Sequence, residues 1–252
     1  MTRAERNWKW LFVASIVASF SVATGPAAAA TDTCPGPVPN QIPAAPPSPP
    51  ALNVGTIKNL LREYHDKHYN EDVAAVFTSA QKFVEENATR SKRPALVLDI
   101  DETSLTNWPN LAADDFGFVA GGSCDLLPAG PCGFNQWILK SQAAALTPAV
   151  TLFTAAKANG VAVIFITGRP DSQRDATIIN LDRAGYDGWT ELRTRHDHDD
   201  FPNVQAFKQS ERIKVEAEGY TIIANVGDQQ SDIDGGHGGC VFKVPNPFYF
   251  IP

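Results

Sequence analysis

Hydrophobic residues follow two different spacings along the chain. At 54–69 and again at 71–88, apolar side chains recur every three or four positions, which predicts two leading amphipathic helices. Later, short apolar runs at 95–100, 161–167 and 220–226 are bounded by Gly, Pro or polar residues. Such runs are typical of strands that are buried on both faces of a sheet. The pattern therefore predicts helices first and a buried sheet after them.

Further helices and shorter strands separate these runs. We expect helices at about 137–145, 148–159, 171–184 and 209–218, and short strands at 190–194 and 240–244. Alternation of this kind predicts the α/β class: a Rossmann-like parallel sheet with helices on both faces. An irregular insertion at about 102–147, rich in aromatic residues, follows the first strand and predicts a small cap.

Polar residues follow each of the three buried strands. They are Asp99 and Asp101 after the first strand, Thr167 and Gly168 at the end of the second, and Asp228 and Asp232 after the third. Open α/β sheets place ligands beyond the carboxyl ends of their strands, so we expect these residues to converge. Because side chains alternate in an extended chain, the first two aspartates are expected to point the same way, with Ile100 turned into the core.

Each of these signals is weak alone. An Asp-x-Asp pair can simply end a strand and cap the next helix, and Thr-Gly can be a turn. Lys208, which is expected at the start of the helix before the third strand, can be an ordinary surface lysine. Their combination in this order along one chain is much more specific than any one of them alone.

In that order the chain resembles the haloacid dehalogenase (HAD) superfamily of phosphotransferases. The closer resemblance is to its acid phosphatase branch, the bacterial class B and C enzymes and the plant vegetative storage protein type. The stretches that carry it are LDIDETSL, IFITGRP, FKQSERIKVEAEGY, NVGDQQSD and FKVPNPFYFIP. It extends from about residue 52 to residue 252.

The resemblance implies a Mg²⁺-dependent hydrolysis of small-molecule phosphomonoesters. Asp99 would attack phosphorus and form an aspartyl phosphate, while Asp101 would protonate the leaving oxygen and later activate water. Mg²⁺ would be bound by Asp99, the backbone carbonyl of Asp101 and Asp228, because a cluster of acids without a cation would be costly.

Three further groups complete the expected site. Thr167, the amide of Gly168 and Lys208 would hold the phosphoryl oxygens. Asp232 would orient metal-bound water or Lys208. Two other functions stay open: a storage or binding protein without activity on the same fold, and a phosphotransferase that uses an alcohol as acceptor.

The first residues have the layout of a secretory signal peptide. Basic residues, an apolar stretch and AAAA at 27–30 predict a signal peptide at 1–30, followed by a proline-rich tether at 31–51 and the phosphatase domain at 52–252. We expect a secreted, periplasmic or cell-surface protein without stable membrane association after cleavage. An uncleaved anchor is the alternative.

Charge and cysteine content add two expectations. A net charge of -7 argues against a protein that binds a phosphate backbone, so we expect no nucleic acid partner. Four cysteines in an exported chain favour two disulfides over free thiols, with Cys124 and Cys132 as the local pair.

Some features remain ambiguous in the sequence. RHDHDD at 195–200 is a metal site or, as we expect, a polar loop, and GGHGG at 235–239 is expected to be a loop. Asn87 begins a glycosylation sequon. The cap's aromatic residues either stack on a leaving group or form the cap's own core; they are Trp108, Phe116, Phe118, Phe134 and Trp137. The sequence leaves the oligomeric state and the natural substrate open.

Overall fold

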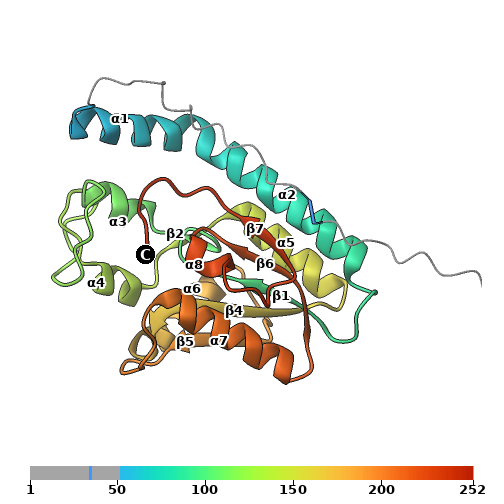
Figure 1. Ribbon diagram of the computed structural model, residues 1–252. Helices are drawn as coiled ribbons and strands as arrows, with labels where there is room; N and C mark the ends of the chain where they lie inside the picture. The colour runs from blue at the N-terminus through green and yellow to red at the C-terminus, as the bar shows by residue number, and fades with distance from the viewer. Residues whose placement is uncertain (1–33, 36–51, 252) are drawn as a thin grey trace, which may run out of the picture. The chain divides into compact units, whose positions relative to one another are not determined.

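The computed structural model describes residues 34–35 and 52–251, so the expected signal peptide and nearly all of the expected tether lie outside the described residues. Five parallel strands form the central sheet in the order β5-β4-β1-β6-β7 (Figure 1). They are β1 (Pro94–Leu98), β4 (Ala162–Pro170), β5 (Glu191–Arg195), β6 (Thr221–Gly227) and β7 (Cys240–Lys243). The predicted parallel α/β sheet is confirmed.

Helices cover both faces of this sheet (Figure 1). On one face, α2 (Asn70–Asn87) and α5 (Thr147–Ala158) cover the larger core, to which β1 contributes Leu96 and Leu98. On the other face, α7 (Val204–Ala217) covers a smaller core that contains Ala95 and Val97. The strict alternation along β1 explains why its whole run is apolar, because both faces are buried.

The two leading helices are not separate, contrary to the prediction. α1 (Val54–Tyr64) continues through a π-helical turn, η1 (His65–Tyr69), directly into α2. The residues at both junctions keep right-handed helical dihedral angles, so no capping residue ends the first helix. The wider turn brings the rings of His65 and Tyr69 into a stacked contact with centroids 5.7 Å apart.

Two predicted helix boundaries are also wrong. The helix expected at 137–145 is α4 (Phe134–Lys140), which ends because Ser141 adopts a left-handed conformation. The helix expected at 209–218 begins at Val204, where the side chain of Asn203 accepts from the amide of Ala206. Lys208 therefore lies inside α7 and not at its start.

The insertion, which we call the cap, has secondary structure of its own. It contains the two-stranded sheet of β2 (Leu105–Thr106) and β3 (Ala144–Ala145), together with α3 (Trp108–Ala113) and α4. Its predicted Cys124–Cys132 disulfide is present, and a second disulfide joins Cys34 to Cys240 at the start of β7. Two disulfides are thus confirmed.

Most of the cap's aromatic residues pack within the protein. Trp137 is buried, and Trp108 and Phe116 pack against Phe248 of the C-terminal segment. Phe118 is 77% exposed, and its ring centroid lies 5.7 Å from that of Phe134. The core interpretation thus fits Trp137, Trp108 and Phe116.

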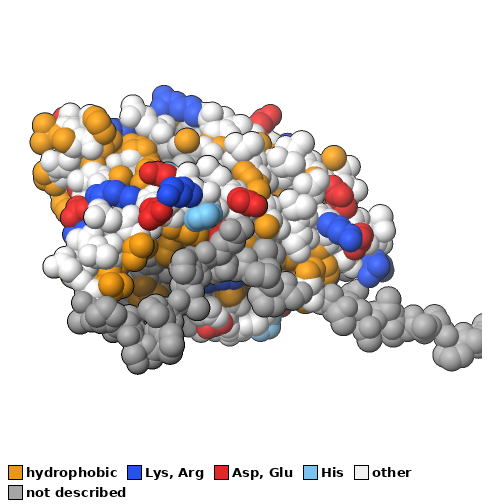
Figure 2. All heavy atoms as spheres, turned by 90° about the horizontal axis from the view of Figure 1, so that it is seen from above, with side chains coloured by type: hydrophobic (Ala, Val, Ile, Leu, Met, Phe, Trp, Pro, Cys, Tyr) orange, Lys and Arg blue, Asp and Glu red, His pale blue; other side chains and the backbone are white. Residues whose placement is uncertain are grey.

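The remaining helical segments follow the carboxyl ends of β4 and β6. A 3-10 turn, η2 (Asp171–Gln173), leads from β4 into α6 (Arg174–Arg183), and α8 (Gln230–Ile233) follows β6. Among the described residues, no helix is long and apolar enough to cross a membrane. On the face shown in Figure 2, acidic and basic side chains lie interspersed.

Candidate active site

Asp99 extends the alternation of β1 toward α7. Its amide donates to the carbonyl of Val226 at 3.0 Å, so the loop leaves the sheet only after this residue. Ala95 and Val97 face α7, and Asp99 is the next residue of that series. Its carboxylate consequently meets the ammonium of Lys208, with 2.5 Å between Nζ and Oδ1.

Asp228 and Asp232 reach the same place from the end of β6. Asp232 lies in α8, where its Oδ2 accepts from the amide of Gln229 at 2.8 Å and its Oδ1 accepts from Lys208 at 2.5 Å. Gly227 makes this approach possible, because a Cβ there would lie 2.3 Å from the Cβ of Asp232. The spacing of the Gly-Asp-x-x-x-Asp stretch is therefore explained by close packing of the strand end on α8.

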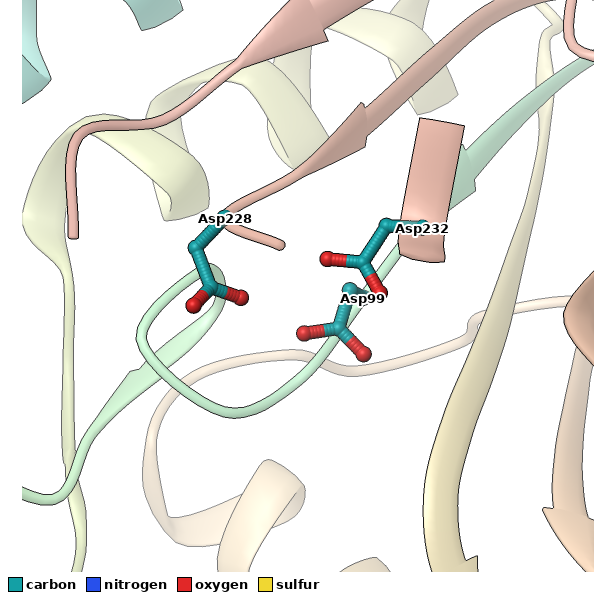
Figure 3. A group of neighbouring side chains, drawn as sticks. All are labelled: Asp99, Asp228 and Asp232. Carbon is teal, nitrogen blue, oxygen red and sulfur yellow. The ribbon is translucent and has the colours of Figure 1, made fainter. Parts of the chain in front are cut away.

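The carboxylates of Asp99, Asp228 and Asp232 converge (Figure 3). One ligand atom from each lies within 4.8 Å of the others, and all three residues are buried. Burial, reinforced by the neighbouring Asp232 carboxylate, raises the pKa of Asp99 well above its usual range and the pKa of Asp228 to about 7.

Among the described residues, Lys208 is the lysine whose ammonium bonds carboxylates of this cluster, while Lys243 donates to the backbone carbonyl of Asp228. Burial alone would lower the pKa of Lys208, but the carboxylates of Asp232 and Asp99 outweigh it and raise that pKa, so the side chain is protonated. One ammonium, bonded to two of the three buried aspartates, leaves excess negative charge when all three are ionised. An all-oxygen donor set with excess negative charge fits Mg²⁺.

Asp101 has different partners from Asp99. The guanidinium of Arg169 binds its carboxylate through Nη2 at 2.7 Å and through Nε at 3.1 and 3.2 Å. Burial would raise the pKa of Asp101, but the charge and hydrogen bonds of Arg169 outweigh burial and lower this pKa. In this state Asp101 is ionised.

The loop after Asp101 is held by a buried polar network. Asn107 donates from Nδ2 to Asp101 at 2.8 Å and to Glu102 at 3.0 Å, and its Oδ1 accepts from the indole of Trp137 at 2.8 Å. Glu102 adopts a positive φ of 51° and is 1% exposed. Burial and the charge of Asp101 raise the pKa of Glu102 to about 7. Through Trp137 this network joins the loop after β1 to the cap.

Two of the predicted phosphate-binding residues, Thr167 and Gly168, lie near the end of β4, and the third, Lys208, lies in α7. Thr167 is fully buried, and its Oγ1 accepts from the amide of Arg169 at 3.1 Å. A Cβ at Gly168 would lie 3.5 Å from Val204, an ordinary contact, so packing does not require glycine there. The role expected for the Gly168 amide stays a prediction.

Several polar residues of the site were missed by sequence reasoning. Arg169 could have been identified from the sequence. It lies two positions beyond Thr167, and side chains two residues apart in an extended strand point to the same face. No sequence signal marked Asn107 or Asn246 as site residues. Their hydrogen-bond partners depend on how the cap and the C-terminal segment pack against the loops after β1 and β6. Asn246 donates to Oδ2 of Asp228 at 2.6 Å.

The other candidate motifs from the sequence do not belong to the cluster of Asp99, Asp228 and Asp232. In RHDHDD, Arg195 pairs with Asp199 at 2.7 Å, and His196 contacts Asp171 at 2.5 Å. Within the described part of the chain, the only group of three or more potential metal-ligating side chains is the aspartate cluster above. Asn87 is buried at the end of α2, where its Nδ2 donates to the carbonyl of Phe83.

Comparison with known proteins points the same way as the geometry. The chain is 31% identical over 194 residues to the stem 28 kDa glycoprotein of Glycine max, covering 75% of this chain and 73% of that one. It is 31% identical over 160 residues to acid phosphatase 1 of Solanum lycopersicum, covering 63% of this chain and 60% of that one. Plant vegetative storage proteins are also similar.

A solved structure shares the fold. The class C acid phosphatase from Bacillus anthracis with tungstate bound superposes with a TM-score of 0.61 at 21% identity, over 77% of this chain and 85% of that one. The family model described as HAD superfamily, subfamily IIIB (acid phosphatase) matches residues 50–252. The chain therefore belongs to the acid phosphatase subfamily IIIB of the HAD superfamily.

Proposed function

We propose that this protein is an exported Mg²⁺-dependent acid phosphatase that hydrolyses small phosphomonoesters through an aspartyl phosphate at Asp99. The observation that carries the proposal is the buried cluster of three aspartates around one lysine at the carboxyl ends of β1 and β6. Family membership supports the reaction class. The two disulfides agree with an oxidising compartment.

Asp99 is the nucleophile in this proposal. A carboxylate that attacks phosphorus divides one difficult displacement into two easier ones. Lys208, 2.5 Å from the attacking carboxylate, supplies a fixed positive charge beside the phosphoryl group, and the hydroxyl of Thr167 supplies a donor. Because Asp232 also binds Lys208, we assign Asp232 to holding this ammonium in place.

Asp101 serves as acid and then as base. Arg169 keeps its carboxylate ionised, which suits the base step that activates water. The acid step needs a protonated Asp101, and a phosphoryl dianion that attracts the guanidinium would weaken the ion pair and let the carboxylate take up a proton. Arg169 thus links the arrival of substrate to the protonation of Asp101.

Mg²⁺ would be held by Asp99, the backbone carbonyl of Asp101 and Asp228. When bound, it would neutralise the excess negative charge of the carboxylates and of the phosphoryl group. Asp232, whose two oxygens are already bonded to Lys208 and to the amide of Gln229, fits an orienting role better than a ligand role.

A storage protein without activity is the alternative from another functional class, and the similarity to vegetative storage proteins is the observation that favours it. The presence of Asp99 with its lysine partner argues for catalysis. A second alternative, transfer to an alcohol, would use the same aspartyl phosphate with another acceptor.

Phosphate release from a panel of phosphomonoesters in the presence of Mg²⁺ tests the proposal. Wild-type protein should release phosphate, and Asp99→Asn, which keeps the shape of the side chain but removes the nucleophile, should release none above background. Adding glycerol and assaying for glycerol phosphate separates transfer from hydrolysis. Equal, background-level release by both proteins would favour the storage function.

A further inference from the structure

The C-terminal segment, residues 244–251, folds back over the acidic cluster. The amide of Val244 donates to the carbonyl of Gly227 at 2.8 Å, which starts the segment beside the end of β6. Farther on, the hydroxyl of Tyr249 donates to Glu102 at 3.1 Å and the amide of Ile251 donates to the side chain of Gln229 at 3.1 Å. The segment thus contacts the loops after both β1 and β6.

An aromatic cluster fixes this segment to the helices and the cap. The ring of Phe248 is 5% exposed and packs against five rings, with centroid distances between 5.2 and 6.4 Å, from Tyr64, His65, Tyr69, Trp108 and Phe116. These residues come from α1, the π-helical turn and the cap. Asn246, two positions earlier, is therefore held in a defined position relative to β6.

The two oxygens of Asp228 are bonded unequally. Oδ2 accepts from the side-chain amides of Gln229 and Asn246, both at 2.6 Å. Oδ1 accepts only a longer bond, from the hydroxyl of Thr103 at 3.2 Å. Two strong donors occupy one oxygen, so the other keeps the greater capacity to bind a cation.

We infer that Asn246 is a positioning residue for metal binding: it holds Oδ2 of Asp228 and so presents Oδ1 as a single ligand atom to the divalent cation. This inference rests on the proposed function, since it concerns the same site. Partners that orient a ligating carboxylate commonly change metal affinity by about 10- to 100-fold when they are removed.

The side chain of Asn246 has two separable tasks. Its Nδ2 donates to Asp228, while its Oδ1 accepts from the amide of Phe248 at 2.9 Å and stabilises the local turn. A serine hydroxyl can accept the same turn bond but is too short to reach Asp228. Asn246→Ser therefore keeps the turn and removes the contact with Asp228.

Titration of the metal-free protein with Mg²⁺ alone, followed by calorimetry, tests the inference without any substrate. We expect Asn246→Ser and Asn246→Ala to weaken Mg²⁺ binding by about 10- to 100-fold. Phe250→Ala is the matched control, because Phe250 belongs to the same segment but is 75% exposed. It should bind Mg²⁺ like wild type.

Thermal unfolding in EDTA shows whether each variant is folded. Wild-type affinity in a folded Asn246→Ser would overturn the inference, and so would the absence of Mg²⁺ binding by the wild type. The phosphate-release assay with Asp99→Asn tests the proposed function independently. Phosphate release by wild type together with unchanged affinity in Asn246→Ser would reject only the role of Asn246.

Discussion

Two clusters in this protein are each centred on one basic side chain that pairs with acids, Lys208 in one and Arg193 in the other, yet they differ in burial. Around Lys208, the side chains of Asp99 and Asp232 are 7% and 3% exposed. Around Arg193, at the β5 edge of the sheet, Glu191 and Glu218 are 41% and 48% exposed, and only Glu211 is largely buried, at 10%. The Arg193 cluster also includes the exposed Lys214, which pairs with Glu211 at 2.6 Å, so it differs from the Lys208 cluster both in its access to water and in its second cation.

This difference separates a structural ion cluster from a binding site. Around Arg193, water solvates the two exposed glutamates, and the forked guanidinium bonds all three acids. Around Lys208, burial leaves the excess negative charge without solvent, which is why the pKa values of Asp99 and Asp228 are raised. Only the second cluster requires another cation.

Removing the basic residue from each cluster should give the largest difference between the two clusters in phosphate release and in the free energy of unfolding. Lys208→Met leaves buried carboxylates without their partner, so we expect loss of phosphate release by at least about 10³-fold and, in EDTA, destabilisation of about 3–5 kcal/mol. Urea unfolding with and without Mg²⁺ measures the second effect, and Mg²⁺ should restore part of the stability.

Arg193→Met is the matched control for this experiment. Its glutamates can turn toward water, so we expect a loss of about 1–3 kcal/mol, no response to Mg²⁺ and unchanged phosphate release. If Arg193→Met responds to Mg²⁺ as Lys208→Met does, the distinction between the two clusters is wrong.

The pH dependence of stability should reveal the acidic cluster in the metal-free protein. The folded-state pKa of Asp228, about 7, lies above its unfolded value near 3.8. A raised pKa gives a contribution that is complete below the unfolded value and lost as the pH rises through the folded value. Glu102, with a pKa of about 7, acts in the same direction.

We therefore expect the metal-free protein to lose stability between pH 5 and pH 8, with a slope approaching about 1.4 kcal/mol per pH unit for each proton. Saturating Mg²⁺ should flatten this slope, because a bound cation keeps the carboxylate ionised. Asp228→Asn, which cannot titrate, should make the slope shallower in EDTA and leave the part contributed by Glu102. Stability in EDTA that is constant or rises over this range would contradict the account.

The smallest expected effect is at the exposed cluster. Glu218→Gln removes one charge from a pair that water already screens, so the free energy of unfolding should change by no more than about 1 kcal/mol. Asp232→Asn is its counterpart in the site and should change both stability and phosphate release, since Asp232 holds Lys208. Urea unfolding of both variants would show whether burial or the number of charges determines the change in the free energy of unfolding.

The sequence predicted the fold, and the convergence of polar residues at the strand ends, because both follow local rules. Alternation in β1 and the rule on strand ends were enough to bring Asp99, Asp228 and Asp232 together. Lys208 was expected beside these residues only from the family resemblance, and its ammonium contacts Asp99 and Asp232 although α7 begins earlier than predicted. Helix boundaries were less predictable, because the π-helical turn and the left-handed Ser141 are set by packing.

The partners of the site residues could not be predicted from spacing. Whether the carboxylate of Asp101 contacts a lysine, an arginine or a metal depends on where β4 positions the side chain of Arg169. The contact of Asn246 with Asp228 depends on an aromatic cluster assembled from α1, the cap and the C-terminal segment. Such contacts between distant parts of the chain are tertiary, and the sequence carries no periodic signal for them.

The most direct test of the account is phosphate release by protein from which divalent cations have been removed. We predict that wild-type protein in EDTA releases phosphate only at the background rate of Asp99→Asn, and that excess Mg²⁺ restores release. Asp228→Ala should need far more Mg²⁺ for the same recovery. Full phosphate release by the wild type in excess EDTA would contradict the claim that the buried aspartates act with a divalent cation.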